Sequence, residues 1–419
     1  MTQIVEIDPL EWNEFEEKHK NGFVMQSAEQ YQLLQKRGRD VKIVGMKQSG
    51  QVVAGAVVTI NKIHGGYNAL MEQGPILDYE DPKLVKIFFE EIKKYYQEQE
   101  QGVVQLEFSP YLSYQNFNDH GEPITDKRDD LVNNITATGA IHQPVRMGMT
   151  DHGSMGWKYE KSLEGITADN LLDHVDKDVK YYLKKNKQFG VTYRFLKRDE
   201  LGDFKKMLED TAKRRGFHDK DIEYYQTVFD VYKDKAHFII AEINFMDYLN
   251  AEQEAIDKLD ERLSVLGERL AAKETKRNRG QFNEFNDQKN QHLKRIDKII
   301  QMYGSMEEVP TEPVLISGAM FLGQGNEMDY YFSGMYDKYK DFYGPYLIQY
   351  EMIKMALEQG FPIYNFLGID GEFDGSDGVL AFKTEFEGYA TQLIGEFVLP
   401  IQPVKYRVLK LIKTILRRG

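Results

Sequence analysis

The chain has 419 residues, enough for two or three domains, and its 67 acidic side chains outnumber its 54 basic ones, for a net charge of −13. That charge argues against indiscriminate coating of nucleic acid, so any RNA contact must use local basic patches. There is no cysteine, which excludes disulfides, thiolate metal sites and a cysteine nucleophile. No run of about 18 apolar residues could form a transmembrane helix. The first residues are acidic and mixed, unlike a signal peptide, so we expect a cytoplasmic protein.

Apolar periodicity predicts a first α/β unit near the start of the chain. Residues 51–63 are β-rich, and residues 67–79 form a second strand that ends in a Gly-Pro break. Residues 82–100 carry apolar side chains at helical spacing, and residues 102–112 are predicted to return as a strand.

A second unit is predicted to begin near residue 151. Its first helix spans residues 163–190, with Thr167 or Asp169 as the N-cap and Gly190 as the stop. The remaining predicted elements alternate between strands and helices, with the strands at 191–198, 235–243, 314–323, 328–336 and 362–370 and the helices at 201–216 and 344–360. A strand pair, a helix and then a strand are typical of acyltransferases of the GNAT type.

Residues 249–303 are predicted to form a two-armed helical hairpin inserted in the second unit. A heptad seam in the first arm consists of Leu249, Ile256, Leu259, Leu263, Leu266 and Leu270. The pattern breaks over residues 273–283, where Asn278 and Gly280 favour a turn, and a second seam follows. Each arm is roughly 37 Å long at 1.5 Å per residue. The hairpin could be an inert spacer, a dimerisation arm or a contact arm for a large partner.

Two segments carry concentrated positive charge. One runs from Lys180 to Arg198 with seven cations. The other is the tail, residues 405–418, in which six cations alternate with apolar residues as a basic amphipathic helix. Such a helix could lie on an anionic membrane surface or pack its apolar side on the body of the protein.

Spacing alone reveals no catalytic constellation, since a P-loop, a GxGxxG motif and an HExxH motif are all missing. The loop at residues 368–378 holds four acidic residues, which could bind a metal, but it lacks the EF-hand spacing and is better read as a solvated loop. Lys383 lies between apolar residues next to this loop. A lysine in that setting either extends its amine to water or binds an anion.

Several of these segments resemble the Fem family, which builds the interpeptide bridges of peptidoglycan in Gram-positive bacteria, and within it the staphylococcal group. The resemblance spans nearly the whole chain and rests on EQGPILDYED, KQFGVTYRFL, RRGFHDKDIEYY, the hairpin, FYGPYLIQYEMI, YNFLGIDGEF and GVLAFK. It implies a mixed α/β (α+β) protein with two GNAT-like domains and a coiled-coil hairpin in the second. The implied ranges are 1–150 for domain one, 151–245 with 308–395 for domain two, 246–307 for the arm, and 396–419 for a basic helix returning to domain one.

The resemblance also implies an activity, the transfer of glycine, serine or alanine from charged tRNA to the bridge of a lipid-linked peptidoglycan precursor. The aminoacyl ester is already activated and the acceptor is an amine, so the enzyme must position both, stabilise the oxyanion and accept a proton. Neither a cofactor nor a metal is expected. The implied partners are aminoacyl-tRNA, the precursor, a second Fem protein in a homodimer or heterodimer, and the membrane surface.

Site residues follow from matches to the motifs of the family. Lys383 matches the lysine of the FK motif and is the candidate catalytic residue. The candidate substrate-binding residues are Lys36, which lies near but out of register with a family lysine, and Arg215, Tyr224, Tyr225, Tyr331, Tyr364 and Phe382. The hairpin resembles the helical arm of a seryl-tRNA synthetase, so its tip cations are the candidate tRNA-binding residues, namely Lys273, Lys276, Arg277 and Arg279. For each aromatic residue a place in the core is an equally good interpretation.

The sequence departs from the family pattern at several positions that are charged in relatives. Gln73 stands where relatives have arginine, and Ser109 where they have aspartate. A lost arginine can remove a bidentate phosphate contact. The alternatives are therefore a catalytically weak Fem-like partner of an active relative or, less favoured because the Gly-rich pyrophosphate loop is absent, an acetyl-CoA-dependent GNAT enzyme.

Overall fold

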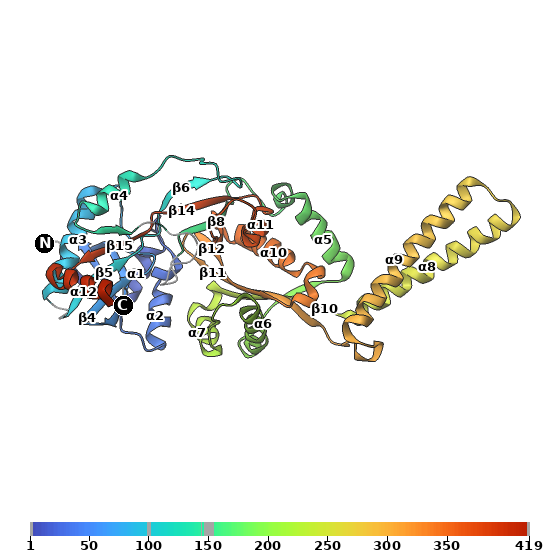
Figure 1. Cartoon of the computed structure of the whole chain (residues 1–419), viewed down its shortest axis with the longest axis horizontal. Helices are drawn as coiled ribbons and strands as arrows, with labels where there is room; N and C mark the ends of the chain where they lie inside the picture. Colours follow the sequence, from blue (N-terminus) through green and yellow to red (C-terminus); the bar gives the residue numbers. More distant parts are fainter. Residues whose placement is uncertain (1–2, 99–101, 144, 146–154, 417–419) are drawn as a thin grey trace.

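The computed structural model describes residues 3–98, 102–143, 145 and 155–416, with side chains as far as residue 412. It has an elongated body that contains two β-sheets, and a long helical hairpin projects from one end of it (Figure 1). The last helix lies at the opposite end of the body (Figure 1). Among the described helices, none combines the length and the apolar character that a membrane crossing requires.

The first sheet is built on a run of four antiparallel strands followed by a helix and a parallel strand. This unit comprises β1 (Ile4–Glu6), α1 (Pro9–Glu16), α2 (Ala28–Lys36), β2 (Val41–Gln48), β3 (Gln51–Ile63), β4 (Gly66–Met71), α3 (Pro82–Glu98) and β5 (Val103–Phe108). Helix α3 provides the crossover that a parallel pair such as β4 and β5 needs. It buries Val85, Phe88, Phe89 and Ile92 on one side, which share a core with the sheet.

The second sheet repeats this order. Its unit comprises β9 (Thr192–Phe195), α6 (Leu201–Arg215), α7 (Ile222–Tyr232), β10 (Ala236–Ile243), β11 (Val314–Gln324), β12 (Glu327–Met335), α10 (Gly344–Gln359) and β13 (Ile363–Gly368). Strands β9 to β12 are antiparallel neighbours, and β13 is parallel to β12. The two GNAT-like units predicted from the sequence are therefore confirmed, with the hairpin inserted between β10 and β11.

The two units exchange strands, which the expected domain boundaries did not anticipate. Strand β6 (Ser113–Phe117), assigned to domain one, pairs with β14 (Tyr389–Leu393) at the edge of the second sheet. Strand β15 (Glu396–Pro400), expected as part of the final helix, lies in the first sheet between β5 and β7 (Ile141–Gln143). The expected boundary at residue 150 falls outside the described residues. The other elements of these connections are α4 (Asp129–Thr136), β8 (Trp157–Ser162), α5 (Lys177–Phe189), α11 (Gly378–Thr384) and α12 (Pro403–Leu416).

Helix α5 is shorter than the sequence pattern predicted. The proposed N-cap residues Thr167 and Asp169 precede it, and the side chain of Asp176 caps it by accepting a hydrogen bond from the backbone N–H of Asp178. The intervening segment contains a short 3-10 turn, Leu171–His174. The apolar pattern of the sequence therefore covers two separate elements, this turn and α5. The predicted stop is confirmed, because Gly190 ends the helix at φ 71°, where glycine is favoured.

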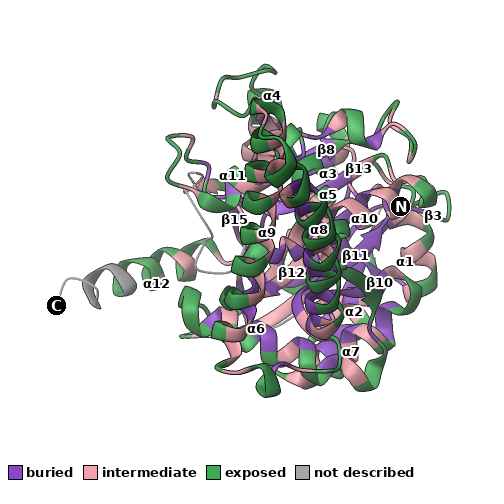
Figure 2. Cartoon of the chain, turned by 90° about the vertical axis from the view of Figure 1, so that its right-hand side faces the viewer, coloured by how far each residue is buried: buried purple, intermediate pink, exposed green. Residues whose placement is uncertain are grey.

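The hairpin consists of α8 (Phe245–Ala272) and α9 (Lys276–Tyr303). The predicted turn around Asn278 and Gly280 is wrong, because both residues lie within α9. The turn spans only residues 273–275, and the hydroxyl of Thr275 caps α9 by accepting from the N–H of Asn278 at 3.2 Å. Five of the six seam residues of α8 are buried and Leu270 is half-buried, and most of the arm is otherwise exposed (Figure 2).

Candidate functional site

Lys383 lies in α11, a short helix that follows β13. Asp377 caps this helix by accepting hydrogen bonds from the N–H groups of Val379 and Leu380 at 2.7 and 3.1 Å. The helix turns Lys383 inward, so that the residue is only 4 % exposed. Its ammonium group donates to the carbonyl oxygens of Leu367 and Gly368 at 3.1 and 2.6 Å.

The strand geometry explains why these two carbonyls accept from a side chain. Strands β12 and β13 pair only from Glu327–Ile363 to Asp329–Asn365 and then stop pairing. Beyond that point Leu367 has φ 58°, an uncommon value for a residue with a branched side chain, which costs of order 1–3 kcal/mol. Buried carbonyls need partners, and Lys383 supplies them where the strand ladder ends.

Burial lowers the pKa of Lys383 to about 7, while the nearby carboxylates of Asp377 and Asp370 act in the opposite direction. A lysine with this pKa changes charge close to neutral pH, whereas an ordinary lysine does so near 10.4. Such a group can stabilise a developing oxyanion as a cation or accept a proton as a neutral amine.

A buried polar network adjoins Lys383 at the point where β12 and β13 part. The side-chain amide of Asn365 donates to Glu327 at 2.9 Å and to Asp329 at 2.8 Å, while its oxygen accepts from the N–H of Leu367 at 2.8 Å. The amide nitrogen of Asn365 also donates to the hydroxyl of Tyr111, and this hydroxyl accepts from the ammonium group of Lys158 at 2.8 Å. The network therefore ties the backbone that Lys383 contacts to both units of the molecule.

The charges in this network are not balanced. Lys158 forms ion pairs with Glu160 and Glu327, and one oxygen of Asp329 has no hydrogen-bond partner in the described structure. Burial raises the pKa of Asp329 well above its usual range, with the negative charge of Glu327 adding to the effect. Sequence reasoning missed all of these residues. The available signal was the charged pair Lys158 and Glu160 alternating with aromatic residues in one strand.

The carboxylates of the acidic loop before α11 accept hydrogen bonds from groups of the same loop. Besides capping α11, Asp377 accepts from the backbone N–H of Asp370 at 3.3 Å. Asp374 accepts from the N–H and the hydroxyl of Ser376 at 2.9 and 2.5 Å. These contacts shape the loop that precedes Lys383.

Phe382 is half-buried beside Lys383 and belongs to an aromatic cluster. Its ring lies 5.1 Å from that of Tyr346, which in turn lies 4.4 Å from the ring of Tyr182 on α5. Tyr346 donates its hydroxyl hydrogen to Glu385 at 3.2 Å. Of the predicted substrate-binding residues, Phe382 is the one that the chain places next to Lys383.

Three other predicted aromatic residues form a separate cluster where the two units meet. The rings of Tyr224 and Tyr225 both pack edge-on against Phe332, and Tyr331 lies 5.1 Å from the same ring. Tyr331 donates to the sulfur of Met25 in the first unit at 2.9 Å. This cluster therefore belongs to the contact between the units.

Two of the predicted aromatic residues have structural partners that account for them. Tyr225 is buried and donates to Asp219 at 2.5 Å, and Asp219 also binds Lys205 at 2.8 Å. Tyr364 is buried and donates to Gln349 at 2.6 Å. For these two residues the contacts match the interpretation as core.

The predicted cations lie on the surface and are dispersed. Lys36 and Arg215 are exposed at the ends of α2 and α6. Beside Lys36, Arg37 forms a bidentate pair with Asp221 at 2.8 and 2.6 Å. All four hairpin cations are exposed at the tip, far from α11 in Figure 1, and one of them, Arg279, pairs with Glu274 at 2.9 Å.

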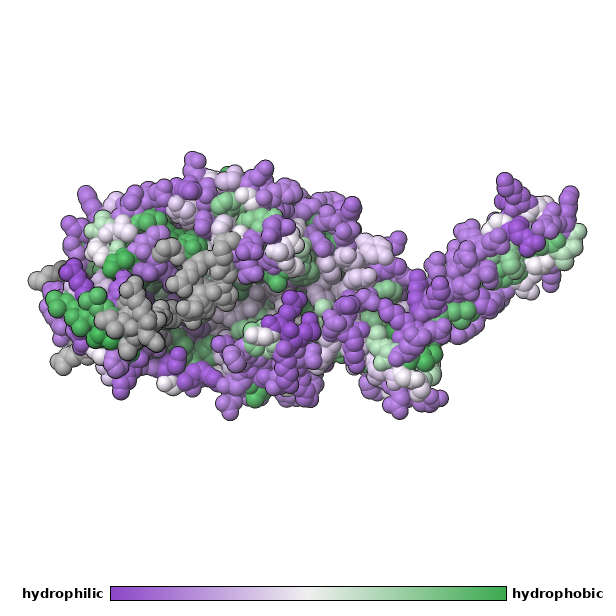
Figure 3. Space-filling view, viewed as in Figure 1, coloured by the Kyte–Doolittle hydropathy of each residue, from purple (hydrophilic) through white to green (hydrophobic). Residues whose placement is uncertain are grey.

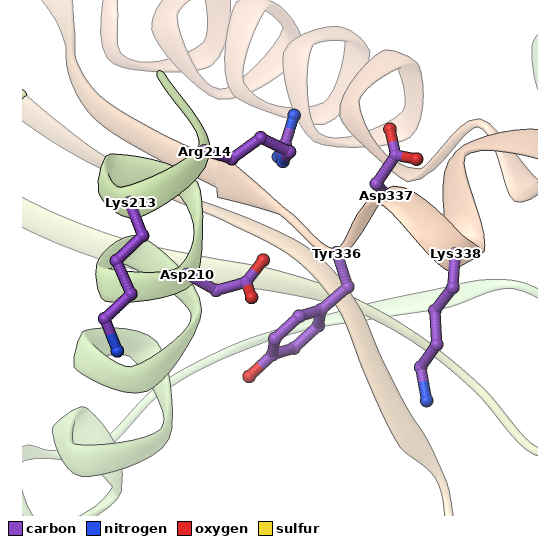
Figure 4. A pocket seen from close by; sticks show the side chains of 6 residues that line it. All are labelled: Asp210, Lys213, Arg214, Tyr336, Asp337 and Lys338. Carbon is purple, nitrogen blue, oxygen red and sulfur yellow. The ribbon is translucent and has the colours of Figure 1, made fainter. Parts of the chain in front are cut away.

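An open hollow of about 590 Å³ lies between α6 and the segment that follows β12 (Figure 4). Its walls combine both signs of charge around one tyrosine, and they consist of Asp210, Lys213, Arg214, Tyr336, Asp337 and Lys338. None of these residues was among the predicted site residues.

Comparisons with known proteins place this geometry in context. The model of the FemAB family matches residues 7–414. The chain is 28 % identical over 417 residues to a protein named Aminoacyltransferase FemA from Staphylococcus epidermidis, covering 97 % of each chain. It is 29 % identical over 400 residues to a protein of the same name from Staphylococcus aureus, covering 93 % of each. A crystal structure of FemX superposes with a TM-score of 0.74 at 18 % identity, over 97 % of this chain and 99 % of that one, and shares its fold.

Proposed function

The chain belongs to the FemAB family, and on this basis we propose that it transfers glycine from a charged tRNA to the interpeptide bridge of a lipid-linked peptidoglycan precursor. It is an aminoacyltransferase of cell-wall synthesis, like the relatives named FemA. The donor, the acceptor and the choice of amino acid are parts of the proposal.

The reaction requires few functional groups beyond those that the site contains. The amine of the acceptor attacks the ester carbonyl, an oxyanion develops, and the amine must lose a proton as the bond to the tRNA hydroxyl breaks. A fixed cation near the developing oxyanion stabilises it most where water is excluded. Lys383 is buried, positioned by two carbonyls, and ionises near neutral pH.

The observation that carries the proposal is the placement of Lys383 where β12 and β13 part. In that position the residue sits on rigid elements, since α11 and β13 fix it from two sides. We assign it the role of oxyanion stabiliser, with Phe382 beside it as a wall of the site.

The amino acid and the acceptor can be identified together. Purified protein would be incubated with tRNA charged with labelled glycine, serine or alanine, and with lipid-linked precursors whose bridges differ in length. We expect label to move from glycyl-tRNA to one class of precursor. Transfer of serine or alanine instead would correct the amino acid, and no transfer from any charged tRNA would contradict the proposal.

One observation favours a second function, a non-catalytic partner of an active relative. Gln73, which replaces an arginine of the family pattern, is buried at φ 54°, and its backbone N–H donates to Ser109 at 3.0 Å. The residue at this position is therefore packed internally, whereas an arginine could form a bidentate contact with phosphate. The chain would then act as a non-catalytic partner in a heterodimer with an active Fem protein, or in a homodimer. The transfer assay distinguishes this function from that of an active transferase.

We also propose that α12 holds the protein at the cytoplasmic face of the membrane, where a lipid-linked acceptor resides. Val404 and Leu411 of this helix are 79 % and 64 % exposed, and Figure 3 shows apolar side chains on the surface at this end of the molecule. The predicted alternative, packing of the apolar side on the body, is supported by Leu409, which is half-buried and approaches Gly65. The helix therefore has apolar side chains on two sides. Arg417 and Arg418 of the predicted basic tail lie outside the described residues.

A further inference from the structure

Helix α5 carries a dense stripe of positive charge on an acidic protein. Its 13 residues include five lysines and one acidic residue, Asp178. Four of the lysines recur at spacings of 3, 4 and 3, which places them on one face of the helix, and these are Lys177, Lys180, Lys184 and Lys187. All four are exposed, and none of them forms an ion pair with a carboxylate among the described residues. Their charge is available to a partner.

Aromatic rings lie beside this stripe. Tyr181 is 50 % exposed, and its ring is 5.6 Å from that of Tyr182. Tyr182 stacks on Tyr343 with 4.4 Å between the ring centroids, and Tyr343 precedes α10 in the left-handed conformation at φ 55°. Lys185 lies over the ring of Tyr181 at 5.5 Å. An exposed ring next to unpaired cations is the arrangement by which proteins stack unpaired bases and bind the adjoining phosphates.

Direct contacts connect this face to Lys383. Tyr182 packs on Tyr346, which packs on Phe382, the neighbour of Lys383. The backbone N–H of Asp176, at the start of α5, donates to the carbonyl of Glu385 at 2.9 Å. Helix α5 also lies beside α10 and α11 in Figure 1. The lysine stripe therefore begins next to α11, the helix that carries the candidate catalytic residue.

Acidic groups lie at the start of the stripe. Asp176 is used as the N-cap of α5, and Glu385 accepts from Tyr346. With Asp178 they form a small negative region near α11. A polyanion lying along α5 would therefore be held mainly by the lysines beyond this region, from Lys180 to Lys187.

We propose that the exposed face of α5 binds the unpaired 3′ end of the charged RNA, with phosphates on the lysine stripe and a base on Tyr181, so that the terminal ester reaches Lys383. The inference rests on the proposed function and names the surface that presents the donor. It is separate from the hairpin tip, which lies far from Lys383 and would contact another part of the same RNA.

The test compares binding of two RNA hairpins, one with an unpaired 3′ extension and one blunt. The variants are Tyr181→Ala and the triple change Lys180→Gln, Lys184→Gln and Lys187→Gln. Matched controls remove exposed groups elsewhere, with Tyr67→Ala in β4 and the triple change Lys83→Gln, Lys86→Gln and Lys94→Gln in α3. Affinities would be measured over a range of salt concentrations.

We expect the wild type to prefer the extended RNA, and Tyr181→Ala to weaken that binding by at least about fivefold with little effect on the blunt hairpin. The α5 triple variant should lower the salt slope by about 2, since each single-strand phosphate contact contributes about 0.7. If the α5 variants bind the extended RNA as well as the controls do, the inference about α5 is wrong and the proposed tRNA donor is unaffected. Absence of RNA binding by the wild type would overturn the tRNA donor as well, and binding of anionic vesicles in place of RNA would assign the stripe to a membrane.

Discussion

Lys383 illustrates which properties of a single residue the sequence can predict and which depend on the fold. The FK motif identified the residue from the sequence, but the two carbonyls that hold it belong to a strand that lies 15 and 16 residues earlier in the chain. Sequence spacing does not indicate where β12 stops pairing with β13, so it could not predict that these carbonyls need a donor. The lowered pKa follows from that burial and was equally invisible.

The pKa of Lys383 predicts how stability depends on pH. An unfolded lysine titrates near 10.4, and the folded one at about 7, so between these values the unfolded state binds more protons and wild-type stability rises with pH. Below pH 7 the cost of the buried charge is constant. Lys383→Met removes this dependence, so its free energy of unfolding relative to wild type should fall as the pH rises from 7 to 10.

Urea unfolding at several pH values checks this prediction, with Lys94→Met on the exposed face of α3 as the control. The control should differ from wild type by an amount that does not change with pH. A Lys383→Met difference that is equally flat would mean that Lys383 keeps an ordinary pKa in the folded protein.

The buried network is a second feature that could not be predicted from the sequence. Lys158, Glu160, Glu327 and Asp329 were not among the predicted site residues, and charged side chains are rarely buried. They are buried because β8, β13 and β12 are neighbours inside one sheet, and the pairing of β13 with β8 joins residues about 200 positions apart. Asn365 was noted as part of a family motif, yet its role as the shared donor required the fold.

At the scale of elements, strongly periodic segments were predicted well and their ends less so. Strand β3 has the predicted bounds, and α3, α6 and α10 agree closely with the prediction. The start of α5 and the turn of the hairpin were misplaced, because Asp176 and Thr275 are caps that the apolar pattern does not mark. Gly280 suggested a turn, but an exposed helix tolerates glycine at a cost of about 1 kcal/mol.

The hairpin predicts an outcome for its removal. Its seam satisfies itself, while residues at its base, such as Phe245 and Ile299, belong to the core of the second unit. Replacing residues 253–295 by a short Gly/Ser linker should therefore leave the melting temperature of the body nearly unchanged. Binding of the peptidoglycan precursor should persist, and binding of charged tRNA should weaken and lose part of its salt dependence.

A control for the hairpin changes only its tip, with glutamine at Lys273, Lys276, Arg277 and Arg279. This variant should reproduce most of the loss in tRNA affinity. If the deletion abolishes dimerisation and leaves tRNA binding intact, the arm serves assembly and the tRNA interpretation is wrong.

Helix α12 predicts binding to anionic lipid. Each lysine or arginine near an anionic surface contributes about 1 kcal/mol, so the six cations of residues 405–418 are enough to hold the protein at moderate salt. Sedimentation with vesicles of phosphatidylglycerol and phosphatidylcholine should recover the wild type and leave a variant with the six cations changed to glutamine in solution. The α3 triple lysine variant serves as the control. Equal recovery of both tail forms would reject the role of α12.

At the scale of the whole molecule, the chain is a duplicated unit whose halves are interlocked. The order of strands and helices repeats, which the sequence predicted in outline. The exchange of β6 and β15 between the sheets was not predictable, because short strands of three to five residues carry little pattern and their partners lie far away in sequence. The exchange places Tyr111, which lies just before β6, in the network next to Lys383.

Under the proposed function, the arrangement would give each end of the molecule a separate task. Helix α12 lies at one end, the hairpin tip at the other, and α11, which carries Lys383, in the body between them (Figure 1). The proposed lipid-linked acceptor and charged tRNA would then approach from different sides without competing for one surface.

The most direct test of this account is the rate at which a single amino acid is transferred from charged tRNA to the lipid-linked precursor in one turnover. Wild type, Lys383→Met and the control Lys94→Met would be compared under the same conditions, with folding verified by circular dichroism. We expect the control to match wild type and Lys383→Met to be slower by about 100-fold or more, the usual effect of removing an oxyanion stabiliser. A folded Lys383→Met protein that transfers the amino acid at the wild-type rate would contradict the account.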